Sequence, residues 1–187
     1  MALHMSLKKM KNDDGTWTEE AKRLIWNKAP LMNPSSSDSL RLDSCNALMD
    51  WYDYGNRDSD YGWEIDHVIP EKILQENNVP QELIDHIDNL RPMHWRNNIK
   101  KGDSFPKYSA DTSHAGSVNL NDVCRDYCVN RDQINVLRQL FMGYLEITHP
   151  TILGQWQVMI DRDIAPSRKI PATILDEIIS PSIYDLD

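Results

Sequence analysis

The chain has 187 residues with a formal net charge of −9, and 40% of its residues are hydrophobic and 26% charged. This length fits one domain, or a small domain with an extension, and the composition is that of an ordinary globular protein. No apolar run is long enough to cross a bilayer, and the acidic balance excludes a protein that is basic over its whole surface, as many DNA-binding proteins are.

The N-terminal residues predict a tail followed by a helix. Met1–Lys11 is too short and too interrupted for a signal peptide, so we expect residues 1–17 to be a tail. Thr16 or Thr18 is the expected N-cap of the helix, whose first turn carries two glutamates. The apolar residues that predict an amphipathic helix here are Ala21, Leu24, Ile25 and Trp26.

The middle of the chain predicts two strands and a helix. Trp63–Ile69 carries apolar residues in imperfect alternation and stops at a proline, which cannot continue a strand ladder. Leu90–Met93 fits a second strand. His94–Lys101 fits a helix, for which Gly102 supplies a C-cap. Between the strands, residues 71–88 are partly helical by their apolar spacing.

The C-terminal part predicts a linker and a helical extension of unknown role. The segment before residue 118 is polar and contains Gly and Ser, which indicates a linker over residues 108–117. The extension, residues 118–187, is expected to be mainly helical, and Val118–Ile147 forms two of its helical parts. The apolar stripe from Ile134 to Leu145 is expected to be its core, with a homodimer interface as the alternative. Further short helices are expected at Leu153–Ile160 and Ala172–Ile179.

Three cysteines, Cys45, Cys124 and Cys128, are too few and too scattered for a disulfide framework. The spacing of Cys124 and Cys128 fits one face of a helix. We therefore expect buried free thiols and a reducing compartment, either the cytoplasm or the nucleus.

Two polar blocks lie within the predicted strand–strand–helix segment. Asp66 and His67 stand side by side at the end of the first strand, Asn89 opens the second block, and Asn98 and Lys101 follow inside it. The pattern is D-H-x-x-P, a gap, and N-L-x7-N-x-x-K, which resembles the HNH endonuclease family. The resemblance implies an α+β fold in which a ββα-metal finger is the core of a nuclease domain over residues 18–107.

His67 is the candidate general base. Hydrolysis of a phosphodiester needs a base for the attacking water, stabilisation of charge on the phosphate, and neutralisation of the departing oxygen. An imidazole can accept a proton at neutral pH. The resemblance implies that His67 activates the water and that the side-chain carbonyl of Asn89 orients its ring. A turn or cap role for Asn89 is the alternative.

The resemblance also implies a metal site on Asp66 and Asn98. One carboxylate and one amide carbonyl form an oxygen-only set, which favours Mg²⁺ or Mn²⁺ over Zn²⁺. Many HNH proteins hold a structural zinc with two Cys-x-x-Cys pairs. The second pair would fall at His94 and Asn97, and no first pair precedes it. We therefore expect no structural zinc, and tryptophan packing in its place.

Basic residues gather at the predicted finger helix although the chain is acidic. They predict a local cationic strip that binds the DNA backbone in a salt-sensitive way. The candidate phosphate contacts are Arg91, Arg96, Lys100 and Lys101, of which Lys101 matches the last position of the motif.

The sequence therefore predicts a metal-dependent DNA endonuclease with a single active site. One alternative is a catalytically silent nucleic-acid-binding or assembly protein that keeps the HNH fold, which the acidic balance and the unmatched C-terminal region motivate. A second alternative is a toxin or effector nuclease with the same chemistry.

Overall fold

The computed structural model describes residues 10–33, 35 and 37–148. The helices predicted at Leu153–Ile160 and Ala172–Ile179 lie outside these residues. The described part combines short helices with short antiparallel strands, so its class is α+β. None of its helices has the length and apolar character that a membrane crossing requires.

The N-terminal helix α1 (Glu19–Trp26) begins where the sequence predicts. The hydroxyl of Thr18 accepts a hydrogen bond from Ala21 N at 3.1 Å, which confirms Thr18 as the N-cap. The residues before it are also ordered, because a β-bridge joins Lys11 to Trp17. The part of the predicted tail from Lys11 onward therefore folds back as a turn.

A small hairpin follows, made of β1 (Leu40–Leu42) and β2 (Leu48–Asp50). The 3-10 helix η1 (Trp51–Asp53) comes directly after β2. The loop between the strands is organised by Asp43, which is 3% exposed. Its carboxylate accepts hydrogen bonds from Cys45 N and Ala47 N, both at 2.8 Å.

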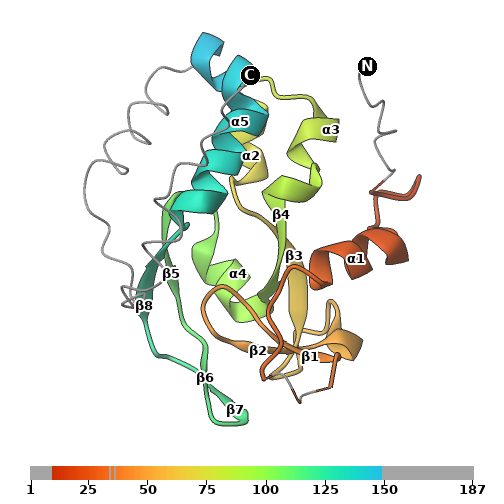
Figure 1. The fold of residues 1–187 in the computed structure, drawn as a ribbon, viewed down its shortest axis with the longest axis vertical. Coiled ribbons are helices and arrows are strands. Elements are labelled where there is room, and N and C mark those ends of the chain that lie inside the picture. Colours follow the sequence, from red (N-terminus) through yellow and green to blue (C-terminus); the bar gives the residue numbers. More distant parts are fainter. Residues whose placement is uncertain (1–9, 34, 36, 149–187) are drawn as a thin grey trace, which may run out of the picture. The chain divides into compact units, whose positions relative to one another are not determined.

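The central feature is an antiparallel pair of strands that leads directly into a helix. β3 (Trp63–His67) pairs with β4 (Leu90–His94), and α4 (Trp95–Lys101) starts at the next residue. Gly102 ends α4 with a positive φ of 50°, as predicted. Figure 1 shows the strand pair between α1 and α4.

The insertion between β3 and β4 is helical, as the apolar spacing predicts. It holds α2 (Glu71–Glu76), α3 (Gln81–Ile84) and the 3-10 turn η2 (Ile87–Asn89). Its apolar residues Leu74 and Ile84 are buried, so the insertion packs as part of the domain and does not extend as a free loop.

The prediction of a linker over residues 108–117 and of a helix beginning at residue 118 is wrong, because residues 107–128 form four short strands. β5 (Lys107–Ala110) pairs with β8 (Arg125–Cys128), and β6 (Ser113–Ala115) pairs with β7 (Val118–Leu120). Tyr108 and Ala110 are buried. Cys124 and Cys128 consequently lie on or beside a strand, and only Cys45 of the three free thiols is fully buried.

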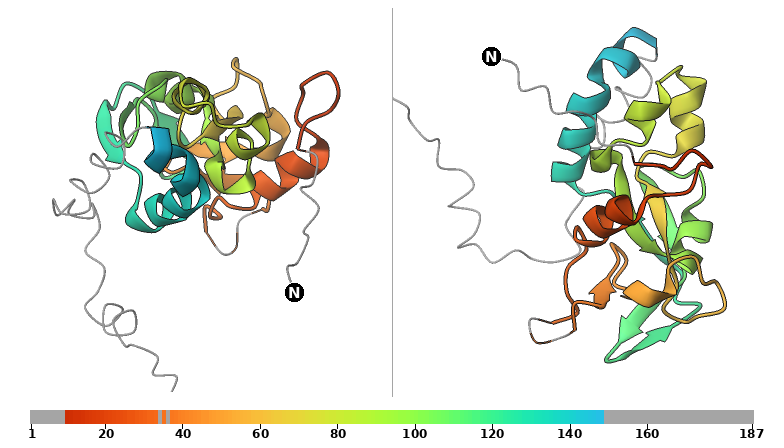
Figure 2. Two further views of the ribbon diagram at one scale, coloured as in Figure 1. Left: turned by 90° about the horizontal axis from the view of Figure 1, so that it is seen from above. Right: turned by 90° about the vertical axis from the view of Figure 1, so that its right-hand side faces the viewer.

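The last described element is α5 (Arg131–Thr148), the second part of the predicted helical stretch. Three residues of its apolar stripe, Ile134, Leu137 and Phe141, are buried. A hydrogen bond of 2.8 Å from Gln133 Nε2 to Asp88 O joins α5 to η2. In Figures 1 and 2 α5 lies beside α2 and α3.

The core on the α1 side of the strand pair is aromatic. Trp26, Trp63 and Trp51 pack against one another in tilted and edge-to-face arrangements, with ring centroids 4.7 to 5.8 Å apart. Such contacts add about 0.5–1.5 kcal/mol per pair beyond the burial of apolar area. They fix the position of β3, whose last two residues begin the candidate site.

Candidate active site

Asp66 and His67 are neighbours in β3 and point to opposite sides of it, as successive residues in a strand do. The carboxylate of Asp66 contacts Lys101 of α4 and Arg91 of β4, whereas the ring of His67 contacts Asp85, just after α3. The two side chains therefore belong to two adjoining networks that meet at the end of the strand.

The carboxylate of Asp66 lies between two cations. Its Oδ1 accepts from Lys101 Nζ at 2.9 Å, and its Oδ2 accepts from Arg91 Nε at 2.8 Å. The side chain of Lys101 is 1% exposed and that of Asp66 is 4% exposed. Burial lowers the pKa of Lys101, and Asp66 offsets part of this effect. Burial acts in the same sense on Arg91 and is the largest single contribution, but the charge and hydrogen bond of Asp66, together with Tyr108 and Cys45, outweigh it and raise the pKa of Arg91.

These positions correct the roles predicted for Lys101 and Arg91. A phosphate contact requires a cation that reaches the surface, but both side chains turn inward to Asp66. Lys101 also donates to His67 O at 2.9 Å, so its ammonium group ties the end of α4 to the end of β3. Their role in the structure is to hold the strand end and to compensate its carboxylate.

Arg91 is held in turn by Tyr108 of β5. Its Nη1 donates to the Tyr108 hydroxyl at 3.2 Å, and the guanidinium lies 5.0 Å from the centre of the ring. Burial raises the pKa of Tyr108 to about 12, so the phenol stays protonated at neutral pH. The strand β5, which the sequence did not predict, therefore supports the side chains that bind Asp66.

The ring of His67 is bound by Asp85, with 2.9 Å between Nε2 and Oδ1. Asp85 also accepts from Lys11 Nζ at 3.0 Å and from Gln81 Nε2 at 3.0 Å. Although burial opposes ionisation, these hydrogen bonds and the charge of Lys11 lower the pKa of Asp85 to about 2. The Trp17 ring lies 6.0 Å from that of His67, centroid to centroid.

Asn89 does not take the place beside His67 that the resemblance implies. Its Oδ1 accepts from Ile69 N at 2.9 Å, and its Nδ2 donates to Ile69 O at 3.2 Å and to Ile84 O at 3.0 Å. The side chain is fully buried. Asn89 thus clamps the two ends of the α2–α3 insertion together, and Asp85 is the residue after one clamped end.

Asn98 lies on α4 but its amide does not meet Asp66. Its Nδ2 donates to Glu64 Oε2 at 2.9 Å, and Glu64 Oε1 accepts from Arg57 Nε at 2.6 Å. Glu64 precedes Asp66 by two residues in β3, so both carboxylates lie on the side of the strand that faces α4. The alternation of the strand is the signal from which Glu64 could have been included in the predicted site.

The oxygens of Glu64, Asp66 and Asn98 are hard donors of the kind that Mg²⁺ and Mn²⁺ bind. A carboxylate oxygen has two acceptor sites, so the bonds from Lys101 and Arg91 leave Asp66 capable of a further contact. The donor chemistry therefore fits the predicted ion. Three cations nevertheless pair with the two carboxylates: Arg57 with Glu64, and Arg91 and Lys101 with Asp66. Within the described residues, no three acidic, His or Cys side chains form a ready metal cluster.

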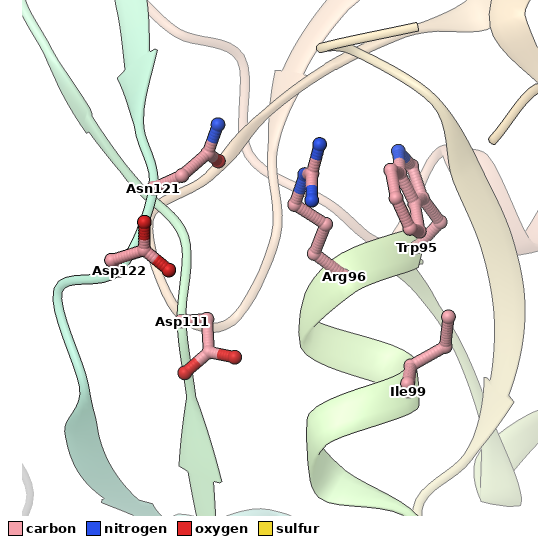
Figure 3. Close-up of a pocket in the computed structure, with 6 residues that line it drawn as sticks. All are labelled: Trp95, Arg96, Ile99, Asp111, Asn121 and Asp122. Atoms are coloured by element: carbon pink, nitrogen blue, oxygen red, sulfur yellow. The ribbon is translucent and has the colours of Figure 1, made fainter. Parts of the chain in front are cut away.

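Arg96 and Lys100 point away from Asp66. Lys100 is 41% exposed at its side chain and lies 3.3 Å from Asp111. Arg96 stacks over Trp95 at 4.3 Å and lines a cavity of about 140 Å³. Figure 3 shows this cavity between α4 and the strand segment. Its lining residues are Trp95, Arg96, Ile99, Asp111, Asn121 and Asp122, so it is separate from Asp66 and His67.

His94 and Asn97, the positions to which the resemblance would assign a zinc-binding pair, take part in a hydrogen-bonded cluster with Asp43. Asp43 Oδ2 accepts from His94 N at 3.2 Å and from Asn97 Nδ2 at 2.9 Å. Asn97 Oδ1 accepts from Thr112 N at 2.8 Å. The buried carboxylate of Asp43 and the buried amide of Asn97 thus join the loop after β1 to the start of α4. The sequence predicted tryptophan packing in place of a structural zinc, but it did not predict these hydrogen bonds.

The chain matches no known family model, no curated protein and no solved structure.

Proposed function

We propose that the chain is a metal-dependent endonuclease of the HNH type that hydrolyses DNA phosphodiester bonds. The observation that carries the proposal is the junction of β3, β4 and α4. Two antiparallel strands lead directly into a helix whose Lys101 reaches back to Asp66 and to the carbonyl of His67. This order of elements is the one that the sequence resemblance implies, and it supports the proposal.

His67 is the proposed general base. Asp85 is ionised at neutral pH, because its pKa is about 2, so it can only accept hydrogen bonds. The Nε2 of His67 must then carry the hydrogen, which leaves Nδ1 of the neutral ring as the atom that accepts a proton from water. The side chain is 14% exposed, so the ring is not sealed from solvent.

Asp66 and Asn98, with Glu64 beside them, are the residues that would hold a divalent cation. Such an ion supplies charge stabilisation on the phosphate and at the departing oxygen. Arg91 and Lys101 fix the carboxylate of Asp66 by one hydrogen bond to each oxygen. The carboxylate of Asp66 is thereby held in place before substrate binds, and such preorganisation is what a site of this kind needs.

The test is plasmid nicking by the wild type and by His67→Ala, with Mg²⁺, with Mn²⁺ and with chelator. We expect the wild type to nick in either metal and His67→Ala to lose at least about 100-fold in rate, the lower end for removal of a general base. His114→Ala is the matched control, because His114 lies on β6, outside the site. Full activity of a folded His67→Ala protein would rule the assignment out.

One observation favours the second candidate, a nucleic-acid-binding protein without catalysis. Asp66 is 4% exposed and paired with two cations, as structural carboxylates often are. Metal-dependent DNA binding without cleavage of duplex, single-stranded or branched DNA would favour this candidate over the first.

A further inference from the structure

We propose that Asp85 is the positioning residue of His67, holding the ring so that Nδ1 faces the water. The inference rests on the proposed function and names a residue that the HNH motif does not contain. The juxtaposition that carries it is the 2.9 Å contact between Asp85 Oδ1 and His67 Nε2, made by a residue of the insertion between the two strands.

The contact is built by several parts of the chain. Both oxygens of Asp85 are used, since Gln81 donates to Oδ2 and Lys11 lies within 3.0 Å of both. The side chain is 10% exposed. Lys11 is itself placed by its bridge to Trp17 and by its ammonium group, which lies 4.5 Å from the Trp17 ring. Asp85 is therefore contacted by three side chains, those of His67, Lys11 and Gln81, which come from three separate segments of the chain.

The side chain of Asn89 contributes to this arrangement by binding the backbone of the two segments that carry His67 and Asp85. Its bond to Ile84 O fixes the residue immediately before Asp85, and its bonds to Ile69 fix the backbone two residues after His67. Asn89, to which the motif assigns the orientation of the base, would thus act indirectly, without a contact to the ring of His67. It sets the distance between the two segments that carry His67 and Asp85.

The chemical consequence concerns the tautomer of the base. A carboxylate that accepts from Nε2–H favours the tautomer with the lone pair on Nδ1, and it stabilises the imidazolium that forms when the water is deprotonated. Removal of Asp85 should therefore affect the rate constant of the reaction more than the binding of DNA. Asp85 does not touch the reacting atoms in this scheme.

The first test is ¹⁵N NMR of the histidine rings at alkaline pH, where the neutral tautomer is observed directly. We expect His67 to show the Nε2–H tautomer in the wild type and a mixture in Asp85→Ala. Asp88→Ala is the matched control, because it removes a half-exposed carboxylate three residues further on. An Nδ1–H tautomer in the wild type, or an unchanged spectrum in Asp85→Ala, would overturn the proposal.

The second test is nicking kinetics on the same proteins. We expect kcat of Asp85→Ala to fall about 10- to 100-fold, by analogy with the loss when the hydrogen-bond partner of a metal-ligating histidine is removed, with KM for DNA changed by less than about twofold. Asp85→Glu should recover part of the loss. A fall confined to KM, with no recovery, would contradict the positioning role. An inactive wild type would defeat the proposed function, while the NMR result would still decide whether Asp85 holds the ring.

Discussion

Lys101 Nζ lies 2.9 Å from Asp66 Oδ1, at a point where the ammonium group is almost completely buried. A buried cation is tolerated only when its charge and hydrogen bonds are satisfied. Here Asp66 supplies the charge and His67 O a second acceptor. The pair joins the end of α4 to the end of β3, so the stability of the domain and the geometry of the candidate site depend on the same contact.

Lys101→Met should destabilise the domain by about 3 kcal/mol, the lower end for removing one partner of a buried ion pair, because Arg91 still compensates Asp66. Lys100→Met is the matched control. The neighbouring lysine is 41% exposed, so its loss should change the free energy of unfolding by less than about 0.5 kcal/mol. Urea unfolding measures both. Equal effects of the two substitutions would show that Lys101 is not a buried partner.

Local signals in the sequence were sufficient for the elements around this contact. The threonine cap of α1, the alternation in β3 and the glycine after α4 each act within a few residues. The strands of residues 107–128 failed to be predicted because each is three or four residues long, too short for a periodic pattern. Their stability comes from pairing and from packing on α4, which a local pattern does not contain.

The candidate site was predictable only in part for the same reason. The motif placed Asp66, His67, Asn98 and Lys101 on β3 and α4, but spacing does not reveal that Lys101 is buried. Asp85 lies 18 positions after His67 and reaches it through the fold of the insertion. The apolar spacing of residues 71–88 predicted helices there, but no local signal pointed to a partner for the base.

Asp43→Asn should be destabilising although the two side chains have the same shape. The carboxylate accepts from four donors, and an amide would turn its own NH₂ group toward at least one of them. An unsatisfied buried donor costs about 1–3 kcal/mol. Thermal or urea unfolding measures the loss, and Asp38→Asn is the control, because Asp38 is 71% exposed. An equally small effect of both substitutions would show that the Asp43 cluster contributes little.

Asp85 should make stability depend on pH in the acid range. Its pKa falls from 3.8 to about 2 in the folded state, so the unfolded chain binds the proton more readily. The contribution of Asp85 is therefore complete above about pH 4 and is lost as the pH falls toward about 2. Asp85→Asn should flatten the fall in unfolding free energy over this window. An unchanged slope would indicate that the contacts of Asp85 with His67, Lys11 and Gln81 do not persist in solution.

Lys100 is the member of the predicted phosphate-binding set whose exposure fits a DNA contact. Lys100→Ala should weaken DNA binding on all sequences alike and reduce the slope of log affinity against log salt by about 1, the value for one lost phosphate contact. Lys22→Ala on α1 removes a cation that lies beside Glu19 and should leave the slope unchanged. Fluorescence anisotropy over a range of salt concentrations measures both. Equal slopes for all three proteins would exclude Lys100 from the DNA surface.

Metal binding should be weak without DNA and stronger with it. Arg57, Arg91 and Lys101 already compensate Glu64 and Asp66, so the negative charge that favours a divalent cation must come partly from a phosphate. Calorimetric titration of His67→Ala with Mn²⁺, in which the DNA is expected to stay intact, should show at least about tenfold tighter binding when a short duplex is present, or about 1.4 kcal/mol. The duplex alone and the double variant His67→Ala/Asp66→Asn correct for ions bound by DNA. Equally tight binding without DNA would mean that the cations do not oppose the metal, and no binding in either case would remove the ion from the proposed reaction.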